Sequence, residues 1–175
     1  MGKTKWFIDR ANSEIGFKAN HMMFSNVPGE IRKFKSLITT SVDVFDNAKI
    51  EFDGQIKSIT TEKEESEADQ SIADLFYVNQ FSKVTFEAIT FDKIDEVNYK
   101  LTGNLTLCNV TRLVTFDAEF SGLLKEPWGV IKASFIITGI INRTHWDLNM
   151  NRMFDTGIPI SEELKLNIDL RFIRR

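Results

Sequence analysis

Few residues in the sequence could carry out chemistry, and their spacing matches no familiar reaction centre. The two histidines, His21 and His145, belong to no metal-binding spacing such as His-x-His or His-Glu-x-x-His. Cys108 is the single cysteine, so it has no disulfide partner in the chain, and no base can be identified beside its thiol. The Gly-x-Ser-x-Gly turn of hydrolases and the glycine-rich loops that hold phosphates are also absent. We therefore expect no catalytic residues, no metal site and no cofactor, and a protein that is not an enzyme.

The elements that must position any site are β-strands, because apolar and polar residues alternate over most of the chain. The clearest runs are 14–21, 50–57, 84–91, 99–107, 114–120, 130–142 and 164–172. Turn signals such as Asp46-Asn47, Asp95-Glu96 and Glu126-Pro127 separate the runs, as in an antiparallel meander. About eight strands with one apolar face each can bury those faces only in a sandwich or a closed barrel. The acidic residues mostly alternate outward, which gives no support for paired catalytic carboxylates.

The composition bounds the class of protein. A chain of 175 residues with 42% hydrophobic residues fits a single ordered domain over residues 1–175. The formal net charge of −3 lacks the broad positive field that a nucleic-acid partner would need. No run approaches the roughly 20 apolar residues of a membrane span, and the first residues lack the apolar segment of a secretory signal. We expect a cytoplasmic protein, or a periplasmic one if a signal peptide has been removed.

Phenylalanine and glycine raise the question of what fills the interior. The 15 phenylalanines far outnumber the three tryptophans and two tyrosines, which indicates a large, dry core. Gly54, Gly103 and Gly139 fall on the apolar sides of strands, where they indicate bends or the close approach of another group. Small inward residues could also leave room for a ligand. The sequence alone therefore leaves open a barrel with a cavity and a barrel filled by its own side chains.

One segment departs from the strand pattern. Residues 62–69 carry five acids and one lysine, as expected of a solvated connection. In the following segment, 71–81, the residues Ile72, Leu75 and Phe76 have helical spacing. We predict a short helix there that caps one end of the barrel.

A series of motifs runs through the chain in the order, and nearly at the spacing, of a known family. Near the start these are Trp6-Phe7-Ile8-Asp9, the run 13–17 followed by His21-Met22, and the run 27–34 (VPGEIRKF). Further along they are 58–61 (SITT), 74–76 (DLF), 81–86 (FSKVTF), 101–111 (LTGNLTLCNVT) and 141–146 (INRTHW). Together they cover about residues 6–172 and resemble the YceI-like family of polyisoprenoid-binding proteins.

This resemblance implies an all-β fold: an elongated, eight-stranded antiparallel lipocalin-like barrel with a short capping helix. Its interior would hold a long apolar chain such as a polyisoprenoid, a quinone tail or a fatty-acid derivative, and the protein would store or carry that lipid without catalysis. Each methylene taken from water contributes about 0.8 kcal/mol, so a dry tunnel alone can drive binding. Barrels of this family commonly form homodimers, and the resemblance is the only ground for expecting a dimer here.

Strand parity and the resemblance together select candidate ligand-binding residues. The inward candidates are Phe17, Ala19, Phe52, Ile56, Phe86, Leu105, Phe116 and Ile137. Phe76 and Phe81 are expected near the entrance, and Trp146, if it points inward, would shorten the tunnel. His21 and Arg143 are candidate polar contacts to a lipid head group, although each has a structural alternative: a satisfied histidine at the barrel end and a salt bridge or carbonyl anchor at a strand end.

The sequence departs from the family pattern at Asn12, where the family commonly has His, and at Cys108-Asn109 and Trp146-Asp147, where its second residue is usually Gly. Asn and Asp enter the positive-φ region more readily than most residues, so the turns can persist. Two other functions stay open. One is a filled barrel that acts as an interaction or stress-response module through protein partners. The other is a lipid-modifying enzyme with His21 as its base, which lacks a predictable carboxylate partner.

Overall fold

The computed structural model describes residues 3–21, 26–41, 44–55, 59–61, 83–107, 109–146 and 160–175, with backbone alone at 19–21, 26–30, 59–61, 143 and 160–162. The elements in this part of the chain are β1 (Lys3–Ile8), η1 (Arg10–Asn12), β2 (Glu14–His21), β3 (Asn26–Ile31), β4 (Phe34–Ser41), β5 (Val44–Gln55), β6 (Ile59–Thr61), β7 (Lys83–Lys93), β8 (Asn98–Leu107), β9 (Val110–Lys125), β10 (Ile131–Asn142), η3 (Arg143–Trp146) and β11 (Ile160–Arg174). The predicted helix over 71–81 and the acidic segment 62–69 lie outside the described residues. None of the described helices is long and apolar enough to cross a membrane.

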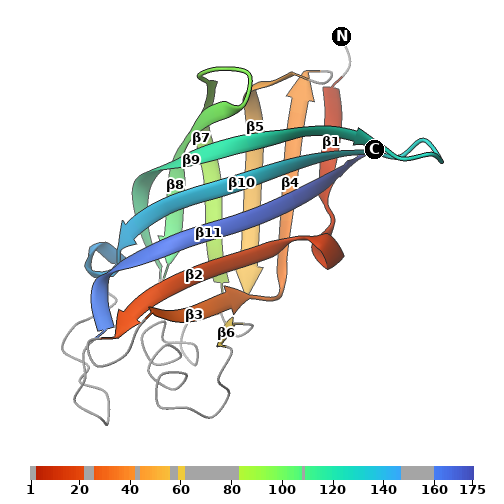
Figure 1. Cartoon of the computed structure of the whole chain (residues 1–175). Helices are drawn as coiled ribbons and strands as arrows, with labels where there is room; N and C mark the ends of the chain where they lie inside the picture. Colours follow the sequence, from red (N-terminus) through yellow and green to blue (C-terminus); the bar gives the residue numbers. More distant parts are fainter. Residues whose placement is uncertain are drawn as a thin grey trace.

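The strands close into an antiparallel barrel (Figure 1). β1 and β2 both pair with β11, one on each side of η1, so they act as one interrupted strand. In the same way β3 and β4 pair with β2 and β1, and β6 and β5 pair with β3 and β4. With β7 to β11 this makes eight long strands, each bonded to the next in sequence, and β11 closes the ring. The predicted all-β, eight-stranded antiparallel barrel is confirmed.

At the break between β1 and β2, residues of the connecting segment replace the missing strand partner of β11. The Asp9 amide donates to the Arg171 carbonyl oxygen at 2.7 Å, and the Arg171 amide donates to Ser13 Oγ at 2.9 Å. Backbone groups that face an interrupted strand need such substitute partners. Asn12, one of the departures from the family pattern, donates from Nδ2 to Asp9 Oδ2 at 2.8 Å and so holds the turn.

A half-buried ion cluster ties this break to the β9–β10 hairpin. Lys132 Nζ lies 3.4 Å from Asp9 Oδ2 and 3.0 Å from Glu126 Oε1. The hydrogen bond from Asn12 is the largest influence on Asp9 and, with Lys132, lowers the pKa of that carboxyl below its ordinary value of 3.8, although burial acts in the opposite direction. A lowered folded-state pKa stabilises the protein above pH 3.8 and stops doing so as the pH falls through the folded value.

The Asp9→Asn variant is therefore expected to melt below the wild type at pH 7, because it lacks the carboxylate that faces Lys132. The difference in melting temperature should shrink as both proteins are acidified below the ordinary pKa of 3.8. Thermal unfolding at a series of pH values measures this. A difference that stays constant down to acid pH would show that Asp9 contributes through something other than its charge.

Seven aromatic rings fill the barrel at the end where β1 begins and β11 ends. We call this set the aromatic plug: Trp6, Phe45, Phe91, Tyr99, Phe120, Phe135 and Phe172. Ring centroids lie 4.7 Å apart for Phe91 and Tyr99 and 5.1 Å apart for Trp6 and Phe45. The Trp6 indole N–H donates to Thr40 Oγ1 at 3.0 Å, so the buried tryptophan has a polar partner. This half of the barrel is packed with its own side chains.

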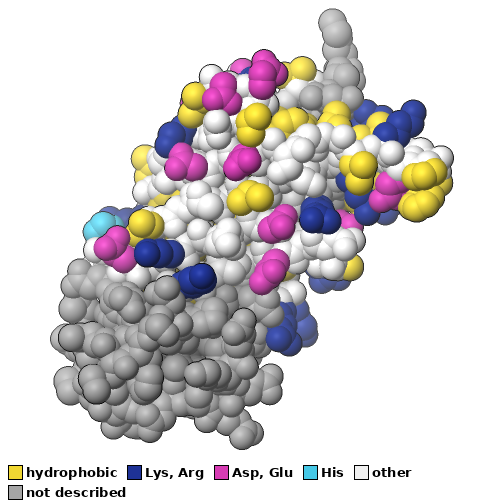
Figure 2. Space-filling view, in the orientation of Figure 1, with side chains coloured by type: hydrophobic (Ala, Val, Ile, Leu, Met, Phe, Trp, Pro, Cys, Tyr) yellow, Lys and Arg dark blue, Asp and Glu magenta, His cyan; other side chains and the backbone are white. Residues whose placement is uncertain are grey.

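The outer surface follows the predicted alternation. On the face seen in Figure 2, acidic and basic side chains are interspersed, with apolar side chains scattered between them.

The predicted turns at Asp95-Glu96 and Glu126-Pro127 are confirmed. The turn predicted at Asp46-Asn47 is wrong, because both residues lie inside β5. Asn47 has a φ of 62° where the pairing of β4 with β5 shifts register, a conformation that asparagine adopts more readily than most residues.

The space beside the inward glycines Gly54, Gly103 and Gly139 is occupied by neighbouring side chains and backbone, not left free for a ligand. A Cβ at Gly139 would collide with the Phe116 ring, and one at Gly54 would lie 3.0 Å from both Phe52 Cζ and Val84 Cγ1. At Gly103 a Cβ would collide with the Glu87 carbonyl oxygen and lie 2.9 Å from the Ala88 Cα. Of the two uses that the sequence left open for these glycines, the structure shows close approach.

We expect Gly103→Ala to lower the free energy of unfolding by about 3 kcal/mol, because the added methyl group meets backbone atoms of β7 that cannot rotate away. Gly54→Ala is the matched control and should cost about 1 kcal/mol, since its neighbours are side-chain atoms that can shift. Urea unfolding of the two variants gives the comparison. Equal costs would mean that β7 yields as easily as a side chain.

Candidate ligand-binding cavity

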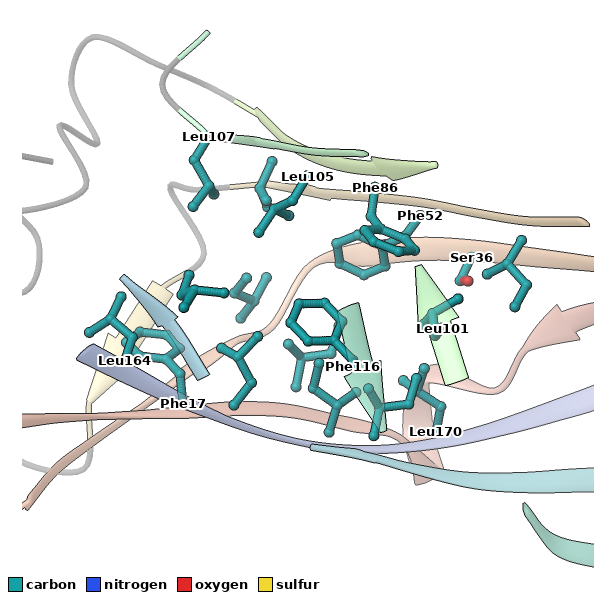
Figure 3. Close-up of a pocket in the computed structure, with 18 residues that line it drawn as sticks. Phe17, Ser36, Phe52, Phe86, Leu101, Leu105, Leu107, Phe116, Leu164 and Leu170 are labelled. Atoms are coloured by element: carbon teal, nitrogen blue, oxygen red, sulfur yellow. The ribbon is translucent and has the colours of Figure 1, made fainter. Parts of the chain in front are cut away.

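The half of the barrel beyond the aromatic plug contains an apolar cavity of about 120 Å³. A single water needs only about 10–15 Å³, so the space exceeds a packing defect. Its lining comprises Ile15, Phe17, Ile31, Ser36, Ile50, Phe52, Val84, Phe86, Leu101, Leu105, Leu107, Phe116, Ile137, Ile141, Leu164, Leu166, Ile168 and Leu170. In Figure 3, Leu107, Leu164 and Phe17 lie at one end of the cavity, and Ser36, Leu101 and Leu170 lie at the other.

Strand alternation explains why these side chains meet. On β11, every second residue from Leu164 to Leu170 faces the interior. Phe52, Ile137 and Leu166 also face inward, yet they are only half-buried. In a filled interior such residues would have lost nearly all their accessible surface. All three line the cavity, and part of the surface that they retain faces it.

Among the described residues, the lining of the cavity is almost free of polar groups. Ser36 is the one polar residue among those that line it, and its Oγ donates to the Glu51 carbonyl oxygen at 2.8 Å. None of the lining residues that the structure describes carries a charge. Among the described residues there is also no group of three His, Cys, Asp or Glu side chains that could hold a metal ion. Such a space favours an apolar ligand over water or an ion.

Six of the predicted ligand-binding residues line this cavity: Phe17, Phe52, Phe86, Leu105, Phe116 and Ile137. The structure describes the backbone alone for three more, with Ala19 and His21 in the last part of β2 and Arg143 at the start of η3. The remaining predicted candidates in the barrel wall and entrance lie outside the described residues, namely Ile56, Phe76 and Phe81.

Trp146 belongs to the buried core of the barrel. It is 2% exposed, it is not among the cavity-lining residues, and its Nε1 donates to the Leu105 carbonyl oxygen at 2.9 Å. Arg112 Nε donates to the His145 carbonyl oxygen at 2.9 Å. These two bonds attach η3 to β8 and β9. Asn109 has a φ of 62°, as expected for an asparagine in place of the usual glycine.

Several lining residues lie on the predicted apolar faces of strands but were not predicted as site residues. Leu164, Leu166, Ile168 and Leu170 had been assigned to one face of a strand but were not selected as site residues. Period-two alternation was sufficient to find them. Ser36 lies in β4, a strand that the pattern reading did not identify, so its inward position could not be predicted.

A closed antiparallel barrel around an apolar cavity is the architecture of barrels that hold one small ligand. The chain belongs to the YceI-like family, since the family model described as "YceI-like domain" matches residues 6–172. The resemblance deduced from the motifs is thereby confirmed.

The known proteins similar to this chain agree with that assignment. The UPF0312 protein SA2479 of Staphylococcus aureus strain N315 is 29% identical over 171 residues, which cover 97% of each chain. The crystal structure of Burkholderia cenocepacia BcnA aligns with a TM-score of 0.78 at 17% identity, covering 94% of this chain and 98% of BcnA. A polyisoprenoid binding domain from Saccharophagus degradans, implicated in plant cell wall breakdown, aligns with a TM-score of 0.67 at 12% identity, covering 95% and 97%. At these identities the two structures support the fold.

Proposed function

We propose that this protein binds a long-chain lipid, with the apolar chain inside the barrel, and stores or transports it without catalysis. The observation that carries the proposal is the cavity, whose described lining residues are all apolar except for Ser36. The Saccharophagus degradans neighbour is described as a polyisoprenoid binding domain, which makes a polyisoprenoid the first ligand to test. A quinone or a fatty-acid derivative offers the same chain chemistry.

The geometry favours one direction of entry. The aromatic plug closes the barrel at one end, so a chain would enter where β8 ends at Leu107 and β11 begins. The backbones of His21 and Arg143 lie at this end, since one residue ends β2 and the other follows β10. We propose that these two residues contact the lipid head group. The apolar chain would point towards the plug and gain about 0.8 kcal/mol for each buried methylene.

The size of the cavity limits how much of the ligand it encloses. A volume of about 120 Å³ between described residues accommodates a segment of a long chain rather than the whole of one. The rest of the chain and the head group would lie towards the entrance. The affinity would therefore depend on how many methylenes of the chain reach the cavity.

Binding of three probes to delipidated protein tests the proposal: a polyprenyl alcohol, a quinone with an isoprenoid tail, and palmitate. We expect saturable binding of at least one probe, measured by titration calorimetry, with a negative heat-capacity change because apolar surface is buried. Absence of binding by all three would favour the filled-barrel interaction module. The cytoplasmic location and the homodimer stay predictions, which cell fractionation and analytical ultracentrifugation would test.

A further inference from the structure

We infer that the aromatic plug acts as a length gauge, with Phe135 as the residue that sets the longest chain the barrel accepts. The inference rests on the proposed function, because it concerns how deep the proposed lipid chain can reach. It adds a specificity-determining residue and a property of the ligand, its chain length, that the cavity alone does not define.

The register of the strands places Phe135 at the floor of the cavity. On β10, Ile137 lines the cavity, and Phe135 lies two residues further along the same face. Across the β10–β11 pair, Phe135 is directly opposite Leu170, which also lines the cavity. Phe135 is 2% exposed and lies directly behind these lining residues, on the side of the cavity that faces the aromatic plug.

The floor is rigid because four other rings hold Phe135. Its centroid lies 5.1 Å from Phe45, 5.1 Å from Phe120, 5.9 Å from Phe91 and 6.3 Å from Phe172. A chain that pushed past Phe135 would have to displace a ring with neighbours on several sides. Closely packed interiors resist such displacement. The depth of the cavity is therefore fixed, because these packed rings do not move aside for a longer chain.

Two substitutions should move that depth in opposite directions. Phe135→Leu removes the ring from the floor, while the other plug rings stay in place. Leu170→Phe adds a ring on the cavity side of the floor and leaves no void, so it keeps the test informative even if the first variant folds poorly. One layer of a strand spans two residues, or about 6.7 Å, which is the scale of the expected change in depth.

The matched control is Phe45→Leu. Phe45 belongs to the plug and touches Phe135, but it is not part of the cavity lining. The substitution removes the same number of atoms from the plug and leaves Phe135 as the floor. A general loosening of the barrel would affect this control as much as Phe135→Leu, whereas a length gauge would not.

The experiment measures dissociation constants for straight-chain fatty acids of increasing length with the wild type and the three variants. For the wild type, affinity should rise about fourfold per methylene and then stop rising at a limiting length. We expect Phe135→Leu to bind acids just above that limit at least tenfold more tightly than the wild type. Leu170→Phe should reach its limit at shorter acids, and Phe45→Leu should keep the wild-type limit.

The outcomes separate the two proposals. A wild type that binds none of the acids, nor the three probes named above, overturns both the proposed function and the length gauge. A limit that a folded Phe135→Leu variant leaves unchanged overturns the length gauge alone, and so does a limit that Leu170→Phe does not shorten. A limit that moves equally in Phe45→Leu also overturns it, because the floor would then not be Phe135.

Discussion

Replacing Ile137 with tryptophan is expected to weaken binding of the lipid chain by about 100-fold or more while the barrel stays folded. Ile137 lines the cavity and is only half-buried, so a larger side chain would occupy the space proposed for the lipid. Excluding about four methylenes forfeits roughly 3 kcal/mol of binding free energy, which is more than a hundredfold in affinity. Titration calorimetry with the tightest of the probe lipids measures the loss.

The neighbouring position provides the control. Ile136 lies on the outer face of the same strand and is 37% exposed, so Ile136→Trp adds an equally large side chain outside the barrel. We expect this variant to bind the lipid like the wild type. If Ile137→Trp also keeps wild-type affinity with an unchanged melting temperature, the lipid does not occupy this cavity.

The second large effect concerns stability. Phe135→Ala is expected to lower the free energy of unfolding by about 4 kcal/mol, because it leaves a void among four aromatic neighbours that cannot all collapse into it. For a chain of this size, that loss corresponds to a melting temperature lower by roughly 8–16 °C. Differential scanning calorimetry of the ligand-free protein gives both quantities.

Ile136 again supplies the comparison, since Ile136→Ala removes a partly exposed side chain from the same strand. It should cost less than about 1 kcal/mol. A small cost for Phe135→Ala as well would mean that the plug is loosely packed. The plug would then be a poor boundary for the cavity, and the closed half of the barrel would have to be reconsidered as part of the binding space.

The period-two pattern was sufficient to predict the strands that run without interruption. Residues 99–107 and 164–172 were expected as strands, and they lie within β8 and β11. The interrupted strands were harder, because a break such as Arg32-Lys33 between β3 and β4 depends on which neighbour each half pairs with. Tertiary contacts across the barrel determine which neighbour each half pairs with, and the local alternation of apolar and polar residues does not predict this.

The choice between a cavity and a filled barrel could not be made from the sequence, since phenylalanine serves both purposes. Phe135 is packed among other rings in the plug, whereas Phe116 lines the cavity. Both lie on inward faces of strands and look alike in the alternation. Gly139 could likewise be expected to leave room for a ligand, but the Phe116 ring occupies the space beside it. The distribution of volume along the barrel axis is a property of the closed structure.

Lipid binding in the cavity is tested most directly by native mass spectrometry of the freshly purified protein beside its Ile137→Trp variant, followed by organic extraction of what is bound. We expect the wild type to carry a long-chain apolar molecule in stoichiometric amount and the variant to carry little or none. Lipid binding is refuted if both proteins show only the ligand-free mass and neither gains mass after incubation with a polyprenyl alcohol, a quinone or a fatty acid.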